Sequence, residues 1–488
     1  MNRTVYPAAR RCGRLSATRH FTVVFSILSI FSVFSVSAQT PAPNVQRFIS
    51  VDESVVALTH VRVVDGTGAR PLDDQTVVIS GGKIWAVQPA GSANVPAGAK
   101  VMDLKGHTVI PGIVGLHNHT FYTTNLRSVQ SNATAPLLYL GSGITTIRTT
   151  GSHSPYAELN LRRLIDAGQI AGPRMHIAGP YLTGGEGVGS MHKVNSPEAV
   201  RRVVDYWAAE GVTWLKFYTD VSREVLAAAI KQAHKRNVKV TGHLCSVSFR
   251  EAVSLGIDNV EHGLFVNTDF DPEKRPDFCP PDALAKLASL DTRGEAARTT
   301  IREMVSHRVP MTSTLAVFEL FVPNRPPLEP RVLDAMAPDV RAEYLTSRAR
   351  LSEPGSFAIS PEIFRNAQRF ELEFVKAGGL MAAGVDPTGN GGALPGFGDQ
   401  RNFELLIEAG FTPVESIRIM TLNGATILGE EKRLGSVTEG KLADLVVIKG
   451  DPVARPAEIR NVAIVFKDGV GYDPAKLIEA CRGLVGIR

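Results

Sequence analysis

The chain has 488 residues, enough to bury a large hydrophobic core and to form more than one structural unit. Its hydrophobic fraction of 44% is typical of a soluble globular protein. The formal net charge of +5 comes from five arginines within the first 38 residues, which contain no acidic residue; the other 48 basic residues balance the 48 acidic ones. The charge therefore gives no support for binding to nucleic acid or to an anionic membrane.

Residues 1–38 have the features of a secretory signal peptide. A positively charged start precedes an apolar stretch from Phe21 to about Val36, and the small residues Ser37 and Ala38 offer a cleavage point before Gln39. An uncleaved membrane anchor is the alternative, but the apolar stretch is short for a bilayer span of ~20 residues. We predict cleavage and a periplasmic or secreted protein, with no membrane contact afterwards.

Both ends of the remaining chain alternate polar and apolar residues as half-exposed β-strands do. The sequence Ser80-Gly-Gly-Lys83 predicts a hairpin turn within the first of these segments. The predicted strands are Val61–Asp65, Thr76–Ser80, Lys83–Val87, Asp444–Lys449 and Val462–Gly469. We predict that residues 39–106 and 427–488 together form one small β-sandwich domain.

The middle of the chain, residues 107–426, alternates short apolar strands with helical patterns. Predicted strands begin near Val109, Ile144, Met175, Val212, Val238, Asn259, Val309 and Leu380. Helices are predicted over residues 199–210, 221–236 and 361–376, with Ser196 as an N-cap and Thr412–Glu415 as a capping box for a further helix. Eight strand–helix units predict a (β/α)8 TIM barrel.

Six candidate metal ligands each lie at the end of a predicted strand. They are His117, His119, Lys216, His243, His262 and Asp386. His117 and His119 are two residues apart, so one strand directs both imidazoles to the same side. Active sites of (β/α)8 barrels lie at the carboxyl ends of the strands, where all six residues fall. Nitrogen and carboxylate ligands in this mixture suit a zinc-like divalent ion.

Three residues near these strand ends are candidate substrate contacts. Tyr218 lies two residues beyond Lys216 and would share its side of the strand; it binds a substrate carbonyl or carboxylate, or is an ordinary packed tyrosine. His153 and His192 follow the second and third predicted strands. Arg148 lies within the second strand, where packing or an internal ion pair is the expected role.

Three cysteines follow the predicted leader: Cys245, Cys279 and Cys481. This odd number permits at most one disulfide and excludes a disulfide scaffold. Cys245 lies two residues beyond His243 and is interpreted as a buried small apolar side chain rather than as part of the site.

These motifs resemble those of the amidohydrolase superfamily of metal-dependent hydrolases. The matching elements are the His117-Asn-His119 pair, the lysine, histidine and aspartate positions above, Gly82-Lys-Ile followed by Val109-Ile-Pro-Gly, and the segment Gly435-Ser-Val-Thr-Glu-Gly-Lys-Leu-Ala-Asp-Leu-Val-Val447. The chain is most similar to the branch of prolidase-like and imidazolonepropionase-like enzymes. Lys216 favours the prolidase-like side.

The resemblance implies a binuclear centre with two divalent metal ions of the zinc type. His117, His119 and Asp386 would hold one ion, and His243 and His262 the other. Lys216 would bridge them as a carbamate formed with carbon dioxide. A hydroxide between the metals would attack the substrate, with Asp386 as general base and acid.

The resemblance further implies hydrolysis of amide C–N bonds in dipeptides or N-acyl amino acids, as a dipeptidase or aminoacylase does. A cyclic-amide or lactone hydrolase is the first alternative, and a ligand-binding protein without catalysis is the second. Expected partners are a small-molecule or dipeptide-like substrate and a second copy of the chain in a homo-oligomer. An insertion at residues 318–360 is interpreted as a lid or an oligomer contact.

Overall fold

A computed structural model describes residues 41–185 and 191–487 of the chain. The predicted signal peptide, residues 1–38, lies outside these ranges. The described residues belong to one compact unit, so the predicted domain boundaries near residues 106 and 427 stay predictions. Among the described helices, none has both the length and the apolar character that crossing a bilayer requires.

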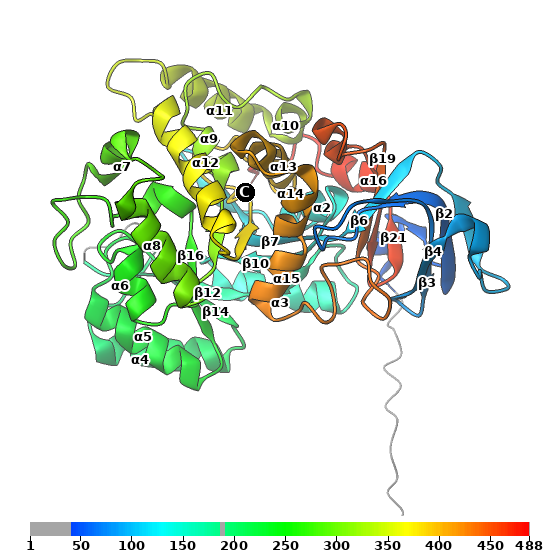
Figure 1. The fold of residues 1–488 in the computed structure, drawn as a ribbon, viewed down its shortest axis with the longest axis horizontal. Helices are drawn as coiled ribbons and strands as arrows, with labels where there is room; N and C mark the ends of the chain where they lie inside the picture. Colours follow the sequence, from blue (N-terminus) through cyan, green and yellow to red (C-terminus); the bar gives the residue numbers. More distant parts are fainter. Residues whose placement is uncertain (1–40, 186–190, 488) are drawn as a thin grey trace, which may run out of the picture. The chain divides into compact units, whose positions relative to one another are not determined.

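Strands from both ends of the chain form one nine-stranded sheet (Figure 1). Its strands are β1 (Ile49–Val51), β2 (Val55–Val63), β3 (Leu72–Ser80), β4 (Lys83–Pro89), β5 (Lys100–Asp103), β6 (His107–Pro111), β19 (Leu445–Lys449), β20 (Val462–Lys467) and β21 (Val470–Tyr472). The predicted hairpin is present, with Ser80 opposite Lys83. Antiparallel pairing of β6 with β19, Val109 opposite Val447, joins the two ends of the sequence. Strand pairing thus joins both ends of the sequence in one sheet, and its arrangement as a sandwich stays a prediction.

The eight strands predicted for the middle of the chain are all present and lie parallel. They are β7 (Ile113–Asn118), β10 (Ile144–Thr149), β12 (Ala178–Thr183), β14 (Trp214–Phe217), β15 (Lys239–Gly242), β16 (Asn259–Glu261), β17 (Met311–Ser313) and β18 (Met381–Ala383). They form two sheets, ordered β11-β10-β7 and β13-β12-β14-β15-β16-β17-β18, with β11 at Arg174–His176 and β13 at His192–Lys193. The fold is thus mixed α/β, and closure of these sheets into one barrel stays a prediction.

Two of the predicted strands are divided in the structure. The strand predicted from Val109 ends as β6 at Pro111 and resumes as β7 at Ile113. Proline has no N–H to continue a ladder, and Gly112 donates its N–H to the Asp444 carbonyl at 2.8 Å. The break lets one predicted segment serve both the nine-stranded sheet and the parallel sheet. The strand predicted near Met175 similarly divides into β11 and β12.

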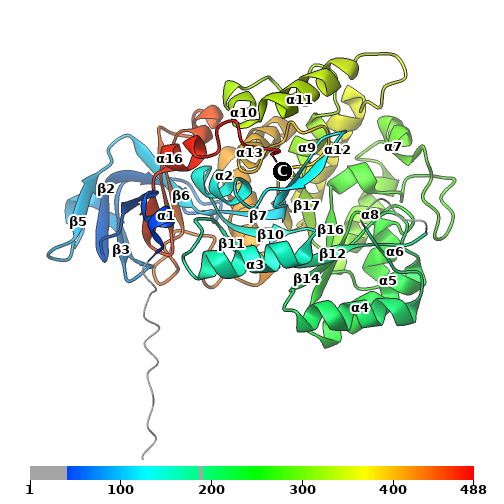
Figure 2. The same cartoon turned by 180° about the vertical axis from the view of Figure 1, so that it is seen from behind.

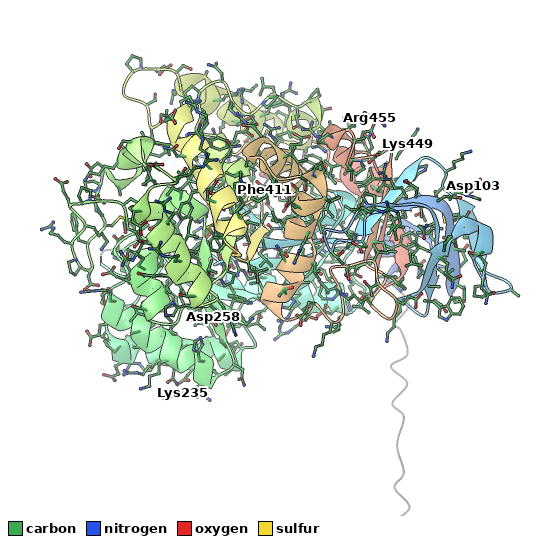
Figure 3. All side chains as sticks on the ribbon, in the orientation of Figure 1. Asp103, Lys235, Asp258, Phe411, Lys449 and Arg455 are labelled. Carbon is green, nitrogen blue, oxygen red and sulfur yellow. A yellow bond between two sulfur atoms is a disulfide. The ribbon has the colours of Figure 1, made fainter. Side chains whose placement is uncertain are left out.

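Helices cover the parallel strands on their outer faces, as the opposite views of Figures 1 and 2 show. The longer ones are α3 (Pro155–Asp166), α4 (Pro197–Ala209), α5 (Arg223–Lys235), α8 (Glu295–Ser306), α12 (Pro361–Lys376), α13 (Phe397–Ala409) and α14 (Pro413–Met420). The predicted caps are confirmed: the Ser196 side chain accepts the Ala199 N–H, and Thr412 and Glu415 form a reciprocal capping box. In Figure 3, Lys235 and Asp258 mark the edge from which β15 and β16 start.

The insertion after β17 folds as three helices, α9 (Leu315–Glu319), α10 (Pro330–Ala335) and α11 (Pro338–Arg350). The last two helices are separate, because Pro338 starts a new helix at its first turn. Val340 and Tyr344 of α11 pack with Val485 near the chain end in one buried cluster. The insertion is therefore anchored on the body of the molecule.

Cys245 is buried, as predicted, and it forms the one disulfide that the cysteine count allowed. Cys245 and Cys279 form a disulfide across a sequence separation of 34, and Cys481 is a buried free thiol. The bond ties the segment after β15 to the long loop that follows β16. Spacing alone did not reveal the pairing, because the loop that brings Cys279 back has no periodic pattern.

We expect the double substitution Cys245→Ser/Cys279→Ser to lower the free energy of unfolding by about 3–4 kcal/mol, since the bond restricts a closed loop of 34 residues in the unfolded chain. Urea unfolding with and without reductant measures this effect. The native protein should lose stability with reductant, whereas the double variant should not respond. Peptide mapping that finds Cys245 and Cys279 as free thiols would contradict the assignment.

Candidate metal centre

Three of the predicted ligands form a tight buried cluster. His117 lies near the end of β7, His119 follows that strand, and Asp386 follows β18. The His119 Nε2 lies 3.2 Å from the Asp386 Oδ1, and the His117 Nε2 lies 3.6 Å from Oδ2. The ligand atoms of the three residues lie within 4.8 Å of one another, a spacing that one metal ion could bridge.

The other three predicted ligands lie beside this cluster. The His262 ring centroid is 4.4 Å from that of His117 and 4.5 Å from that of His243. Lys216, on β14, is buried and faces the same cavity, whose volume is about 420 Å³. All six residues are thus brought to one place from five different strands.

Two of the ligands adopt backbone conformations that are uncommon for residues with a Cβ. His262 has φ +68° and Asp386 has φ +48°, both in the left-handed region. Such strained residues persist where the surrounding structure holds them, and they concentrate at functional sites. Here both mark the point where a strand ends and the chain turns across the cavity.

The approach of β18 to β7 brings Asp386 to the two histidines. The Asp386 N–H donates to the His117 carbonyl at 2.8 Å. A Cβ on Gly384 would lie 2.2 Å from the His117 nitrogen, a clash with backbone that cannot move aside. Only glycine permits this packing, so the sequence Gly384-Val-Asp386 carries a structural requirement as well as a ligand.

A buried carboxylate, Glu261, supports the cluster and was missed in the sequence. Its Oε2 lies 2.8 Å from the His117 Nδ1, and its Oε1 accepts from Arg148 at 2.5 Å and from Asn259 at 2.8 Å. Alternation in a strand would place Glu261 and the next residue, His262, on opposite sides. Because His262 leaves the β conformation, both reach the site. The internal ion pair predicted for Arg148 is confirmed.

Hydrogen bonds also fix the other imidazoles. The His119 Nδ1 lies 3.1 Å from the Gly151 carbonyl oxygen, and the His262 Nδ1 lies 2.8 Å from the Thr314 hydroxyl. Where Nδ1 donates such a bond, Nε2 is the nitrogen left to coordinate a metal. With Glu261 on His117, three of the four imidazoles have an oriented ring.

Burial sets the protonation of the cluster. It lowers the pKa of His117 to about 4 and that of His243 to about 3, so both imidazoles are neutral at neutral pH, the form that binds metal. Burial opposes the charge of Asp386, but His117, His119 and Lys216 outweigh it and hold its pKa below the usual range. Burial also lowers the pKa of Lys216 to about 8. Neutral nitrogens around an ionised carboxylate fit a divalent cation.

The predicted substrate contacts differ in their placement. Tyr218 and His153 line the cavity, and the Tyr218 ring lies 4.4 Å from that of His243. His192 is exposed on β13 at the sheet edge, outside the described residues that line the cavity. Tyr181, which the sequence did not reveal, lines the cavity with its hydroxyl 3.1 Å from the His119 Nε2.

The sequence profile of the amidohydrolase family matches residues 108–471, most of the chain. The protein therefore belongs to the amidohydrolase family. Two of the motifs named for the resemblance, Gly82-Lys-Ile84 and Gly435–Val447, are hydrogen-bonded to each other. The Ile84 N–H donates to the Lys441 carbonyl, and the Gly440 N–H donates to the Ile84 carbonyl.

Several solved structures share this fold. A Xaa-Pro dipeptidase with methionine bound in its active site is 20% identical, with a TM-score of 0.64 over 86% of this chain and 100% of its own. A putative prolidase from Bifidobacterium longum is 24% identical, with a TM-score of 0.61 over 88% and 99%. A bottromycin amidohydrolase is 18% identical, with a TM-score of 0.67 over 90% and 94%. No curated protein matches the sequence.

We expect Glu261→Gln to weaken metal binding on the order of 10–100-fold, because a carboxylate behind a ligating histidine orients the ring and raises its basicity. Metal content after dialysis and calorimetric titration with Zn²⁺ measure the loss. Glu319→Gln is the matched control, since Glu319 is equally buried and paired with Arg325 and Arg401. Wild-type affinity in Glu261→Gln, or an equal loss in both variants, would contradict the proposed support.

Proposed function

We propose that the protein is a hydrolase of amide C–N bonds that uses two divalent metal ions of the zinc type, with dipeptides or N-acyl amino acids as substrates. One observation carries the proposal: four imidazoles, an aspartate and a buried lysine converge on one cavity at the carboxyl ends of parallel strands. The family membership and the prolidase-like fold neighbours support the reaction class.

In this proposal His117, His119 and Asp386 would hold one ion, and His243 and His262 would hold the second. As a carbamate formed with carbon dioxide, Lys216 would supply a further ligand to both ions. The state of Lys216 supports this step: it is 1% exposed, and burial lowers its pKa to about 8 despite the nearby charges of Glu261 and Asp386. A buried ammonium is costly. Conversion to a carbamate replaces that cation with a ligand.

The metal ions, when bound, would lower the pKa of a water molecule toward ~7 and polarise the scissile carbonyl. Asp386 is ionised and hydrogen-bonded to the cluster, so it can accept the proton of the attacking water. It then passes that proton to the departing amide nitrogen, which leaves as a free amine. Tyr218, Tyr181 and His153 line the cavity around these atoms and can donate to the substrate carbonyl.

The same proposal takes the eight parallel strands as a (β/α)8 barrel over residues 107–426, beside a unit built from 39–106 and 427–488. It takes residues 1–38 as a cleaved signal peptide that directs the protein to the periplasm or outside the cell. The Cys245–Cys279 disulfide supports an oxidising compartment. Amino-terminal sequencing of the exported protein tests the cleavage, and a start at Met1 would exclude it.

Metal-loaded protein prepared with bicarbonate should release free amine from a panel of dipeptides and N-acyl amino acids. Asp386→Asn should lower turnover on the order of 10²–10⁴-fold, because it removes the proton acceptor. Asp451→Asn, on the nine-stranded sheet side of the molecule, is the matched control. Activity that survives in Asp386→Asn would remove the proposed base. Ring opening of lactones or cyclic amides, with no amine released from the panel, would favour that alternative reaction.

Lys216→Ala should lose bound metal and activity together, since the bridging ligand disappears. Small carboxylic acids such as acetate should restore part of both, because they can occupy the space of the carbamate. Metal content measured beside activity separates this outcome from misfolding. Two metals retained in Lys216→Ala, with no response to acetate, would count against the carbamate.

A further inference from the structure

One side of the cavity is a continuous apolar surface, here named the aromatic wall. It consists of Val317, Phe318, Phe321, Phe357 and Ile359. All five belong to the insertion between β17 and α12, where Val317 and Phe318 lie in α9 and the other three follow it. The segment closes on itself, because the Ile359 N–H donates to the Phe321 carbonyl at 2.8 Å and the rings of Phe321 and Phe357 lie 5.5 Å apart.

The aromatic wall lies directly against the proposed metal centre. The Phe318 ring centroid is 5.4 Å from that of the ligand His262. On the other side, a Cβ on Gly389, three residues beyond Asp386, would lie 3.1 Å from the Phe321 ring. The wall thus contacts the chain beside both ligands, and a group attached next to the scissile bond would meet it.

The wall is prearranged rather than loose. Phe318 stacks on Phe265, with ring centroids 3.9 Å apart and planes 6° from parallel. Val317 and Ile359 are buried, Phe318 and Phe321 are half-buried, and Phe357 is 64% exposed at the mouth. An exposed phenylalanine that faces a cavity is unfavourable in water, and an apolar ligand would cover it.

Most of the charged side chains that line the cavity belong to the proposed metal centre. Among its described lining residues, the ionisable groups other than tyrosine are His117, Lys216, His243, His262, Asp386 and His153, and the first five are among the proposed ligands. No arginine belongs to the described lining. A charged side chain on the substrate would therefore find an apolar surface and no partner in this part of the chain.

We infer that the aromatic wall is a specificity subsite for a large apolar side chain, aromatic or branched, on the residue next to the scissile amide. The inference rests on the proposed function and deepens it by naming the substrate class. Phe321 and Phe357 are the specificity-determining residues, because they present their rings to the cavity without contacting the metal ligands' side chains in any described interaction.

The test compares metal-loaded protein on matched dipeptides and N-acetyl amino acids that carry phenylalanine, leucine, alanine, aspartate or lysine on either side of the bond. Phenylalanine and leucine should exceed aspartate and lysine by on the order of 10–100-fold in kcat/KM. Phe321→Ala and Phe357→Ala should remove most of this preference, mainly through KM, and should change alanine substrates little. Trp85→Ala, an exposed aromatic on β4, is the control.

Calorimetric binding of L-phenylalanine against L-aspartate gives a readout that does not need turnover. The protein could bind phenylalanine selectively, lose this binding in Phe357→Ala, and hydrolyse no amide. That result would contradict the proposed reaction and support the subsite. Hydrolysis with equal kcat/KM across the series would overturn the subsite and retain the reaction. A preference that survives in both phenylalanine variants would also overturn it.

Discussion

The candidate metal-ligand cluster depends on the close approach of two backbones, β18 and β7. Gly384 packs against the backbone of His117 where no Cβ fits, and the Asp386 N–H then bonds the His117 carbonyl. This contact brings a carboxylate from the carboxyl end of β18 to two imidazoles at the carboxyl end of β7. The ligands are thus placed by main-chain packing, which is stiffer than side-chain packing, and their geometry does not rely on a mobile loop.

Charge balance in the buried site follows from this arrangement. Arg148, Glu261 and His117 form one chain of contacts behind the ligands, with Arg148 also lying over the Trp214 ring. A buried arginine is costly without a charged partner. Glu261 is that partner for Arg148, and it also orients the His117 ring. The interaction that orients the His117 ring therefore also neutralises the buried charge of Arg148.

The sequence predicted the positions of those site residues that lie in or at the ends of regular strands and helices. Strand alternation placed His117 and His119 together, strand ends placed the other four ligands, and the caps at Ser196 and Thr412 matched. It could not reveal Glu261, because alternation fails where His262 turns left-handed. It missed the Cys245–Cys279 bond and the aromatic wall for a related reason: both depend on where long loops return in space, and loops carry no period.

In the proposed reaction, chemistry and specificity come from different parts of this fold. The proposed ligands sit on parallel strands, whereas the aromatic wall comes wholly from the insertion after β17. A change in the insertion can reshape the cavity without moving a ligand, since Phe357 and the metal cluster share no described contact. Fold neighbours that are 18–24% identical act on a Xaa-Pro dipeptide in one case and are named for bottromycin in another. The substrate preference therefore depends on the aromatic wall of this protein and does not follow from the shared fold.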